Sequence, residues 1–171
     1  MATILIVDDE ADCRRPLAAL LKHEGYEITE ARDGLEGLQK LADQPHDLVL
    51  LDMLMPGVDG ITMLQAVRKQ AKFKDLPVLL VTGVHDPVML RKARNIGVQE
   101  YIFKGDTPFA RMLELIKRHL GEHHVPKRRG RKPKVPRPVP PPGSDHKDRM
   151  RVSRFFQLQL EFADKDDADA A

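Results

Sequence analysis

The amino-acid sequence predicts an α/β fold, an open doubly wound sheet of five parallel strands with helices on both faces. Two observations lead to this prediction. From residue 2 to residue 120, short apolar runs alternate with longer amphipathic stretches, a pattern typical of parallel strands joined by crossover helices. Three of the short runs are also apolar throughout, as strands covered by helices on both faces should be.

Five short segments are the predicted strands. Most consist of aliphatic residues, as strands covered on both faces should. They are ILIV at 4–7, YEITEA at 26–31, LVLL at 48–51, PVLLV at 77–81 and EYIFK at 100–104.

The first three helices are predicted from apolar residues spaced three and four apart, which fall on one face of a helix. The three sets are Leu17, Leu20 and Leu21; Leu35, Leu38 and Leu41; and Ile61, Leu64 and Val67. Pro16 lies within the first helical pattern and lacks the backbone N–H that a helix interior uses. We therefore expect the first helix to begin near Asp12 or Cys13.

The last two helices carry their own start signals. Asp86 and Thr107 are each followed by a proline, which predicts an N-cap residue and a proline at the first helical position. Gly97 and Gly121 are the predicted ends, since glycine commonly terminates helices.

Charge is distributed unevenly along the 171 residues. Residues 1–121 hold 16 Lys+Arg and 18 Asp+Glu, residues 122–143 hold 7 and 1, and residues 144–171 hold 5 and 7. Seven of the 13 prolines also fall between residues 126 and 142. We predict one folded domain at 1–121, a basic proline-rich linker or arm at 122–143, and a short C-terminal interaction segment or disordered tail at 144–171.

The sequence gives no sign of export or of membrane association. Its single cysteine, Cys13, cannot form an intrachain disulfide, so an oxidising compartment is not required. No apolar segment approaches the roughly 20 residues that cross a bilayer. We expect a cytoplasmic protein without a membrane partner.

Polar residues follow four of the predicted strands. Asp8 and Asp9 follow the first strand, Asp52 the third, Thr82 the fourth, and Lys104 ends the fifth. In an open doubly wound sheet, ligands bind outside the carboxyl ends of the strands. One aspartate after a strand is usually a turn or cap residue, but five such residues on one rim predict a functional site.

These motifs resemble the receiver domains of two-component response regulators. The similarity covers residues 3–120 and rests on ILIVDDE, LVLLDMLMPGVDG, VLLVTG and EYIFK. It implies a flavodoxin-like sheet in the order 2-1-3-4-5. The composition of the C-terminal residues separately predicts a mostly disordered tail after this domain. It also implies that Asp52 accepts a phosphoryl group from a histidine kinase or a phosphotransfer protein.

Three crowded carboxylates repel one another and either raise a pKa or recruit a cation. Mg2+ is the expected cofactor, because it prefers oxygen ligands and takes one or two carboxylates. The resemblance implies direct coordination by Asp9 and Asp52, a water-mediated contact from Asp8, and the backbone carbonyl of Leu54 as a further ligand.

The resemblance also assigns roles after phosphorylation. Lys104 would pair with the phosphate and Thr82 would hydrogen-bond one of its oxygens. Tyr101 would be the aromatic switch residue, altering the surface of the last two helices and the strand between them; the alternative is a tyrosine that only covers the last strand. Such a protein is not an enzyme, but promotes its own phosphorylation and slow dephosphorylation, as a monomer or a phosphorylation-dependent dimer.

Two positions depart from the family pattern. Gly105 follows Lys104 where most relatives have proline, which predicts a looser lysine loop. Gly83 follows Thr82 where alanine is favoured, which predicts wider access to the phosphate.

Other functions of the core have less support. A haloacid-dehalogenase-type phosphatase needs a second aspartate two residues after the nucleophile, and that position is Leu54. No G-x-G-x-x-G follows a strand, so dinucleotide binding is not indicated. The histidines lack the paired spacing of a metal site.

The basic segment at 126–143 resembles an AT-hook, a short arm that binds the minor groove of A·T-rich DNA. The predicted DNA-binding residues are Arg128, Arg129, Gly130, Arg131 and Lys132. The family core is Arg-Gly-Arg-Pro, whereas here a lysine separates the second arginine from Pro133. The alternative is a stand-alone receiver that acts only through protein–protein binding, with this segment as a solvated spacer.

The last segment contains apolar residues at every second position, which suggests a strand. They are Phe156, Leu158, Leu160 and Phe162. A lone strand is marginal, so pairing with another chain, ordering on a partner and disorder all remain open.

Overall fold

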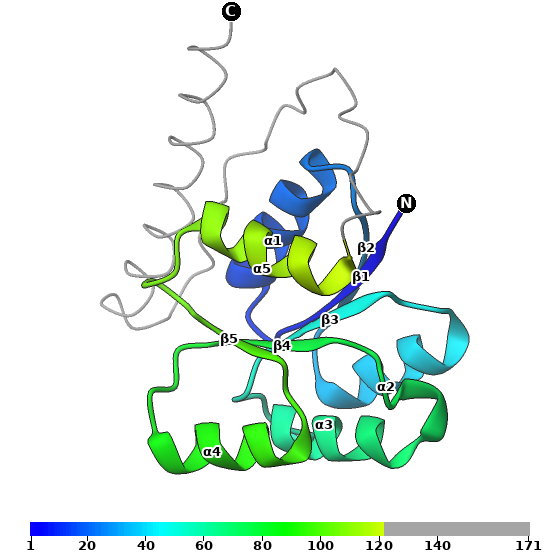
Figure 1. Cartoon of the computed structure of the whole chain (residues 1–171), viewed down its shortest axis with the longest axis vertical. Helices are drawn as coiled ribbons and strands as arrows, with labels where there is room; N and C mark the ends of the chain where they lie inside the picture. The colour runs from blue at the N-terminus through cyan, green and yellow to red at the C-terminus, as the bar shows by residue number, and fades with distance from the viewer. Residues whose placement is uncertain (122–171) are drawn as a thin grey trace, which may run out of the picture.

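The computed structural model describes residues 1–121. The described strands form one parallel sheet in the order β2-β1-β3-β4-β5, which confirms the predicted topology (Figure 1). They are β1 (Thr3–Val7), β2 (Glu27–Ala31), β3 (Leu48–Leu51), β4 (Val78–Thr82) and β5 (Glu100–Phe103). The predictions for residues 122–143 and 144–171 lie outside the described residues.

Helices cover both faces of this sheet. In Figure 1, α1 and α5 lie on one side, and α2, α3 and α4 lie on the other. Their bounds are α1 (Ala11–His23), α2 (Gly34–Asp43), α3 (Gly60–Lys69), α4 (Pro87–Ile96) and α5 (Phe109–Leu120), with a short 3-10 helix, η1 (Ala71–Phe73), before β4.

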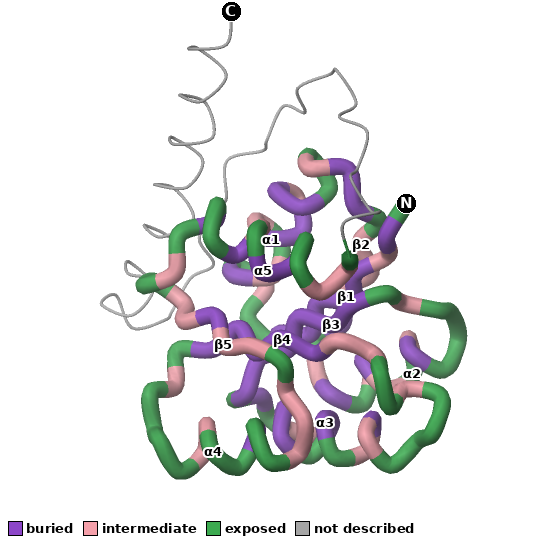
Figure 2. Tube along the Cα trace, viewed as in Figure 1, coloured by how far each residue is buried: buried purple, intermediate pink, exposed green. Residues whose placement is uncertain are grey.

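The two faces have separate cores. Ile4 and Ile6 of β1 pack with α1 and α5, whereas Leu5 and Val7 pack with α2, α3 and α4. Successive strand side chains point to opposite faces, so an apolar run such as ILIV supplies both cores at once. Figure 2 shows the buried residues concentrated along the strands.

The end signals of α4 are as predicted. The Asp86 side chain accepts a hydrogen bond from the Val88 N–H at 2.9 Å, Pro87 begins the helix, and Gly97 ends it with φ of 117°. An L-residue rarely adopts that angle.

The predicted start of α5 is wrong by one residue. The residue before the helix is Pro108, not Thr107. Thr107 instead uses its hydroxyl oxygen to accept the Phe103 N–H at 3.0 Å. Strand pairing does not use the Phe103 N–H. The Thr107 hydroxyl can therefore accept it and close the turn before the helix.

Helix α1 starts close to the predicted position, at Ala11, and contains Pro16 in its interior. Its first turn is tied by the N–H groups of Cys13 and Arg14, which donate to the Glu10 carbonyl at 3.0 and 2.9 Å. The proline therefore removes one later hydrogen bond without ending the helix. No described helix is long and apolar enough to span a membrane.

Candidate functional site

The carboxyl ends of β1 and β3 place two acidic residues side by side. Val7 and Leu51 are register partners, so Asp8 and Asp52 leave neighbouring strands at the same level. The Asp52 N–H continues the ladder by donating to the Val7 carbonyl at 2.8 Å. Both aspartates are buried.

Lys104, directly after β5, bridges the two aspartates. Its Nζ lies 2.8 Å from Oδ2 of Asp8 and 2.7 Å from Oδ2 of Asp52, and only 8% of the lysine side chain is exposed. The other oxygens bind backbone: Oδ1 of Asp8 accepts the Glu10 N–H at 2.8 Å, and Oδ1 of Asp52 accepts the Met53 N–H at 2.6 Å. The carboxylates and the ammonium group are thus fixed relative to one another.

Burial sets the electrostatics of this cluster. It raises the pKa of Asp52, and the nearby Asp8 charge adds to the rise while Lys104 opposes it. Burial alone would lower the pKa of Lys104, but the charges of Asp8 and Asp52 outweigh it and raise that pKa. Lys104 therefore keeps its positive charge. That charge stabilises the ionised form of Asp52, which burial would otherwise disfavour.

A third carboxylate, that of Glu10, joins the cluster. One carboxylate oxygen from each of Asp8, Glu10 and Asp52 lies within 4.8 Å of the others, and Glu10 is 3.6 Å from Nζ of Lys104. Three oxygens at this spacing fit a hard divalent cation, which prefers oxygen ligands. The residues present could therefore hold a metal ion.

Two of the predicted metal ligands are not part of this three-carboxylate group. Asp9 is exposed. The Leu54 side chain is also exposed, and its N–H lies 3.4 Å from Oδ1 of Asp52. Their roles stay predictions. Glu10 was not among the predicted site residues, although it is the third acidic residue of ILIVDDE.

Thr82 ends β4 in a fully buried position. Its hydroxyl oxygen accepts the N–H of Val84, two residues along the chain, at 3.1 Å. Its carbonyl accepts the Lys104 N–H at 3.0 Å, which joins the loop after β4 to the lysine. Thr82 is therefore adjacent to the cluster, with its hydroxyl engaged by its own loop.

The loop after Lys104 is closed by backbone hydrogen bonds. The Phe103 carbonyl accepts the N–H groups of Asp106 and Thr107 at 3.2 and 3.0 Å. Gly105 has φ of +89°, a conformation that proline cannot adopt. The backbone path after the lysine consequently differs from one with proline at this position.

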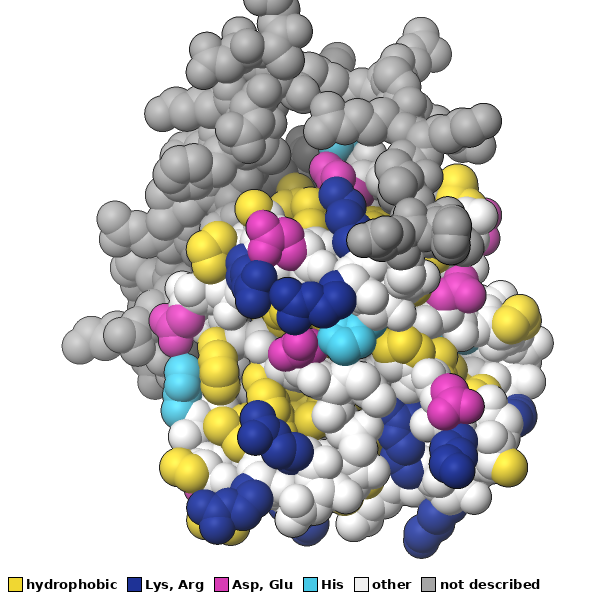
Figure 3. All heavy atoms as spheres, viewed as in Figure 1, with side chains coloured by type: hydrophobic (Ala, Val, Ile, Leu, Met, Phe, Trp, Pro, Cys, Tyr) yellow, Lys and Arg dark blue, Asp and Glu magenta, His cyan; other side chains and the backbone are white. Residues whose placement is uncertain are grey.

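Helix α4 presents a basic surface beside β5. It carries Arg91, Lys92 and Arg94 and no acidic residue, and Figure 3 shows Lys and Arg side chains among hydrophobic ones over this helix. A shallow pocket of about 300 Å³ lies here, lined by Pro87, Leu90, Arg91, Arg94 and Tyr101.

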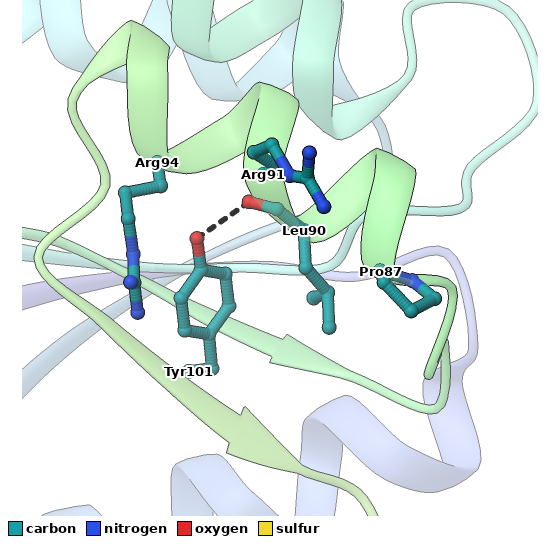
Figure 4. A pocket seen from close by; sticks show the side chains of 5 residues that line it. All are labelled: Pro87, Leu90, Arg91, Arg94 and Tyr101. Carbon is teal, nitrogen blue, oxygen red and sulfur yellow. Dashed lines mark hydrogen bonds between the residues drawn. The ribbon is translucent and has the colours of Figure 1, made fainter.

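Tyr101 forms one wall of this pocket and is anchored to α4. Its hydroxyl donates to the Leu90 carbonyl at 2.6 Å (Figure 4), and the Arg94 guanidinium lies 5.6 Å from the ring centre. The ring is half-buried against the core on the α2–α4 side. In this structure Tyr101 links β5 to α4 through the Leu90 carbonyl, and both its role as a switch and the alternative role stay predictions.

The family comparison agrees with this geometry. The model described as "Response regulator receiver domain" matches residues 4–117. The transcriptional regulatory protein ResD of Bacillus subtilis is 37% identical over 105 residues, which are 61% of this chain and 42% of ResD. The probable chemotaxis protein CheY of Rhizobium etli is 36% identical over 102 residues, 59% of this chain and 79% of that protein.

Solved structures give the same relationship. The chemotaxis protein CheY4 of Vibrio cholerae superposes with a TM-score of 0.65 and 30% identity, covering 69% of this chain and 98% of that one. A CheY-like receiver domain protein of Methanospirillum hungatei gives a TM-score of 0.67 at 30% identity, covering 71% and 95%. The chain spans less than half of ResD, so the similarity concerns one domain of that protein.

Proposed function

Because this chain belongs to the family of response regulator receiver domains, we propose that it takes part in phosphorelay signalling by accepting a phosphoryl group on Asp52. Receiver domains interact with histidine kinases or phosphotransfer proteins, and we propose a donor of that kind here. The observation that carries the proposal is the position of Asp52, buried at the rim and 2.7 Å from the ammonium group of Lys104.

Mg2+ is the proposed cofactor. Asp8, Glu10 and Asp52 have the oxygens and the spacing to hold it, with Asp9 and the Leu54 carbonyl as further predicted ligands. When bound, the ion would neutralise charge that builds on the phosphoryl oxygens. The chain's own contribution is to hold Asp52 still, through the Met53 N–H and Lys104.

Lys104 and Thr82 are the proposed partners of the new phosphate. Phosphorylation adds about −1.5 to −2 charges, and Lys104 already lies within ion-pair distance of the acceptor. Thr82 would supply a hydroxyl once it leaves the Val84 N–H. Movement of Thr82 would let Tyr101 shift, altering the α4-β5-α5 surface. Moving this equilibrium from 1:99 to 99:1 needs about 5.5 kcal/mol of differential interaction.

We propose that the protein is a receiver rather than an enzyme with an external substrate. It would promote its own phosphorylation and slow dephosphorylation, as a monomer or as a dimer formed on phosphorylation. We also propose a cytoplasmic location, because the buried free thiol of Cys13 suits a reducing compartment.

The central test is incubation with acetyl phosphate and Mg2+, followed by intact mass measurement. The wild-type protein should gain the mass of one phosphate, and Asp52→Asn should gain none. A gain that persists undiminished in Asp52→Asn would remove the assignment of Asp52 as the acceptor.

A second proposed activity is binding of A·T-rich DNA by the basic arm at 126–143. Its support is the sequence alone: glycine between two arginines suits a narrow minor groove, and lysines suit phosphates. The competing proposal is a stand-alone receiver that acts only through protein–protein binding, with the arm as a spacer.

Salt separates these two proposals. If the seven basic residues from 127 to 137 engage phosphates, the logarithm of duplex affinity should fall against the logarithm of salt with a slope of up to about 6 in magnitude. An arm of scrambled sequence is the control. Equal binding by that control, or no preference for A·T tracts, would leave only the spacer.

A further inference from the structure

Two loops at the rim of the site are joined by a contact between side chains. The His85 ring, on the loop after β4, stacks on the Phe103 ring at the end of β5, with centroids 4.6 Å apart and planes 11° from parallel. Nε2 of His85 also lies 3.5 Å from Oδ2 of Asp106. His85 therefore connects the loop that begins with Thr82 to the loop that begins with Lys104.

The ring contact is the stronger of these two links. The His85 and Asp106 side chains are 60% and 69% exposed, so water screens their attraction, and exposed ion pairs contribute little. Near-parallel stacking of aromatic rings adds a specific contribution beyond the buried area. The half-buried Phe103 ring provides a fixed surface for it.

The backbone of both loops contains a glycine with space around it. A Cβ atom at Gly83 or at Gly105 would meet nothing within 4 Å. Neither glycine is packed against a neighbour, and glycine leaves the chain more conformational freedom than other residues. The backbone at Gly83 does little to restrain the loop after β4. The stacking of His85 on Phe103 supplies a restraint on that loop.

The loop held by His85 also holds the Thr82 hydroxyl. The oxygen of that hydroxyl accepts the Val84 N–H at 3.1 Å, and Val84 precedes His85 directly. If the hydroxyl moves toward a phosphate on Asp52, it must leave this N–H or carry the turn with it. Either movement would disturb the stacking of His85 on Phe103.

We propose that His85 is a positioning residue that holds Thr82 in its unphosphorylated arrangement and so slows phosphorylation of Asp52. This inference rests on the proposed function. His85 touches no reacting atom; it acts through the turn at 82–85. Its removal should therefore change the rate of phosphate uptake without removing the acceptor.

Acetyl phosphate uptake tests the proposal in the full chain, with the fraction of phosphorylated protein followed by intact mass over time. His85→Ala should take up phosphate roughly three- to tenfold faster than wild type, from the loss of one aromatic contact. His85→Phe keeps the ring and should stay within about twofold of wild type, as should Asp106→Asn. This rescue by phenylalanine separates stacking from a general loss of structure.

Amide hydrogen exchange at Val84 gives a second measurement that needs no phosphate. Exchange should be faster in His85→Ala and near the wild-type rate in His85→Phe. If wild type gains phosphate on Asp52 but His85→Ala matches it in both uptake and exchange, the role of His85 is wrong and the proposed function stands. If wild type gains no phosphate at all, the proposed function fails and this inference fails with it.

Discussion

At the scale of single residues, Gly60 allows the backbone at the start of α3 to pass directly beside the acceptor. A Cβ atom at Gly60 would clash with the Asp52 carbonyl oxygen and lie 2.9 Å from the Cα of Met53. The Gly60 N–H also donates to the Met53 carbonyl at 3.1 Å. Since the neighbouring atoms are backbone, they cannot rotate away to make room.

Gly60→Ala should therefore destabilise the protein by about 1–3 kcal/mol, the usual cost of forcing extra atoms into a packed region. Gly83→Ala is the matched control, because a Cβ atom there meets nothing within 4 Å, and it should stay within about 0.5 kcal/mol of wild type. Urea unfolding measures both. Equal stability of the two variants would mean that the backbone beside Asp52 yields easily.

Lys104 compensates two buried carboxylates, so its removal should make stability depend on pH. The free energy of unfolding of the Lys104→Met variant should be about 3 kcal/mol lower than that of wild type near pH 7.5, because breaking a buried ion pair leaves uncompensated charge. Burial already raises the pKa of Asp52 from its ordinary value of 3.8, and without the ammonium group this pKa should rise further. A carboxyl whose folded-state pKa is raised stabilises the fold below its unfolded value and loses that contribution as pH rises through the folded value.

The variant should consequently be more stable at pH 5 than at pH 8, by a larger margin than wild type. Millimolar Mg2+ at pH 8 should recover part of the loss, since an ion bound only by the folded state stabilises it. Thermal unfolding across pH, with and without Mg2+, measures both effects. A pH profile parallel to that of wild type would contradict the coupling of Lys104 to Asp8 and Asp52.

The acidic residues show where sequence reasoning stops at this scale. That Asp8, Asp52 and Lys104 converge follows from parallel strands, whose carboxyl ends share one edge of the sheet. Which residues of Asp8-Asp9-Glu10 turn toward the cluster depends on loop dihedral angles and on helix α1, whose first residue directly follows Glu10. The strand pattern carries no information about that turn, so Glu10 was missed.

At the scale of elements, Arg68 ties α3 to the turn between α4 and β5. Its Nε and Nη2 donate to the Gly97 carbonyl at 3.0 and 2.8 Å, and Nη1 donates to the Phe73 carbonyl at 2.9 Å. Nη2 also donates to the Gln99 side chain at 3.1 Å. One guanidinium group thus binds the Gly97 carbonyl with two donors and adds a donor to the Phe73 carbonyl, which also accepts the Leu76 N–H at 3.2 Å.

Arg68→Lys should destabilise the protein by about 1–3 kcal/mol, because an ammonium group cannot reproduce the planar fork of donors that binds the Gly97 carbonyl and the Gln99 side chain. Arg111→Lys is the control with the same chemical change. Among residues 1–121, Arg111 has one ion-pair partner, the exposed Glu114 of the same helix at 2.8 Å, so that variant should change stability by less than about 0.5 kcal/mol. Chemical denaturation compares them; similar losses would show that the fork geometry of Arg68 is unimportant.

The helix starts illustrate what the sequence predicts at this scale. Asp86 and Thr107 both precede a proline, yet only Asp86 caps its helix. The difference arises from β5, which leaves the Phe103 N–H free for the Thr107 hydroxyl. Both sites have a capping-type residue followed by proline. The difference in where the two helices begin therefore comes from the neighbouring strand and not from this local pattern.

At the scale of the whole molecule, the two cores draw on the described chain from its first strand to its last helix. Their members run from Ala2 to Leu120, and helices cover both faces of the sheet. The five strands were predictable from their apolar runs, whereas their order was predicted from the resemblance to receiver domains. The positions of loop side chains were not, since they depend on contacts between segments distant in sequence.

If the domain boundary lies at residue 121 as proposed, a chain ending at Gly121 should fold as the full chain does. Its free energy of unfolding should lie within about 0.5 kcal/mol of the full-length value, and it should take up phosphate from acetyl phosphate at the same rate. If the arm at 126–143 binds DNA, the truncated chain should lose that binding, since residues 1–121 hold 16 basic against 18 acidic residues and should repel phosphates weakly. Denaturant unfolding, intact mass and duplex binding test the three expectations separately. A clear loss of stability on truncation would mean that residues beyond 121 pack on the receiver, and the proposed domain boundary would have to move.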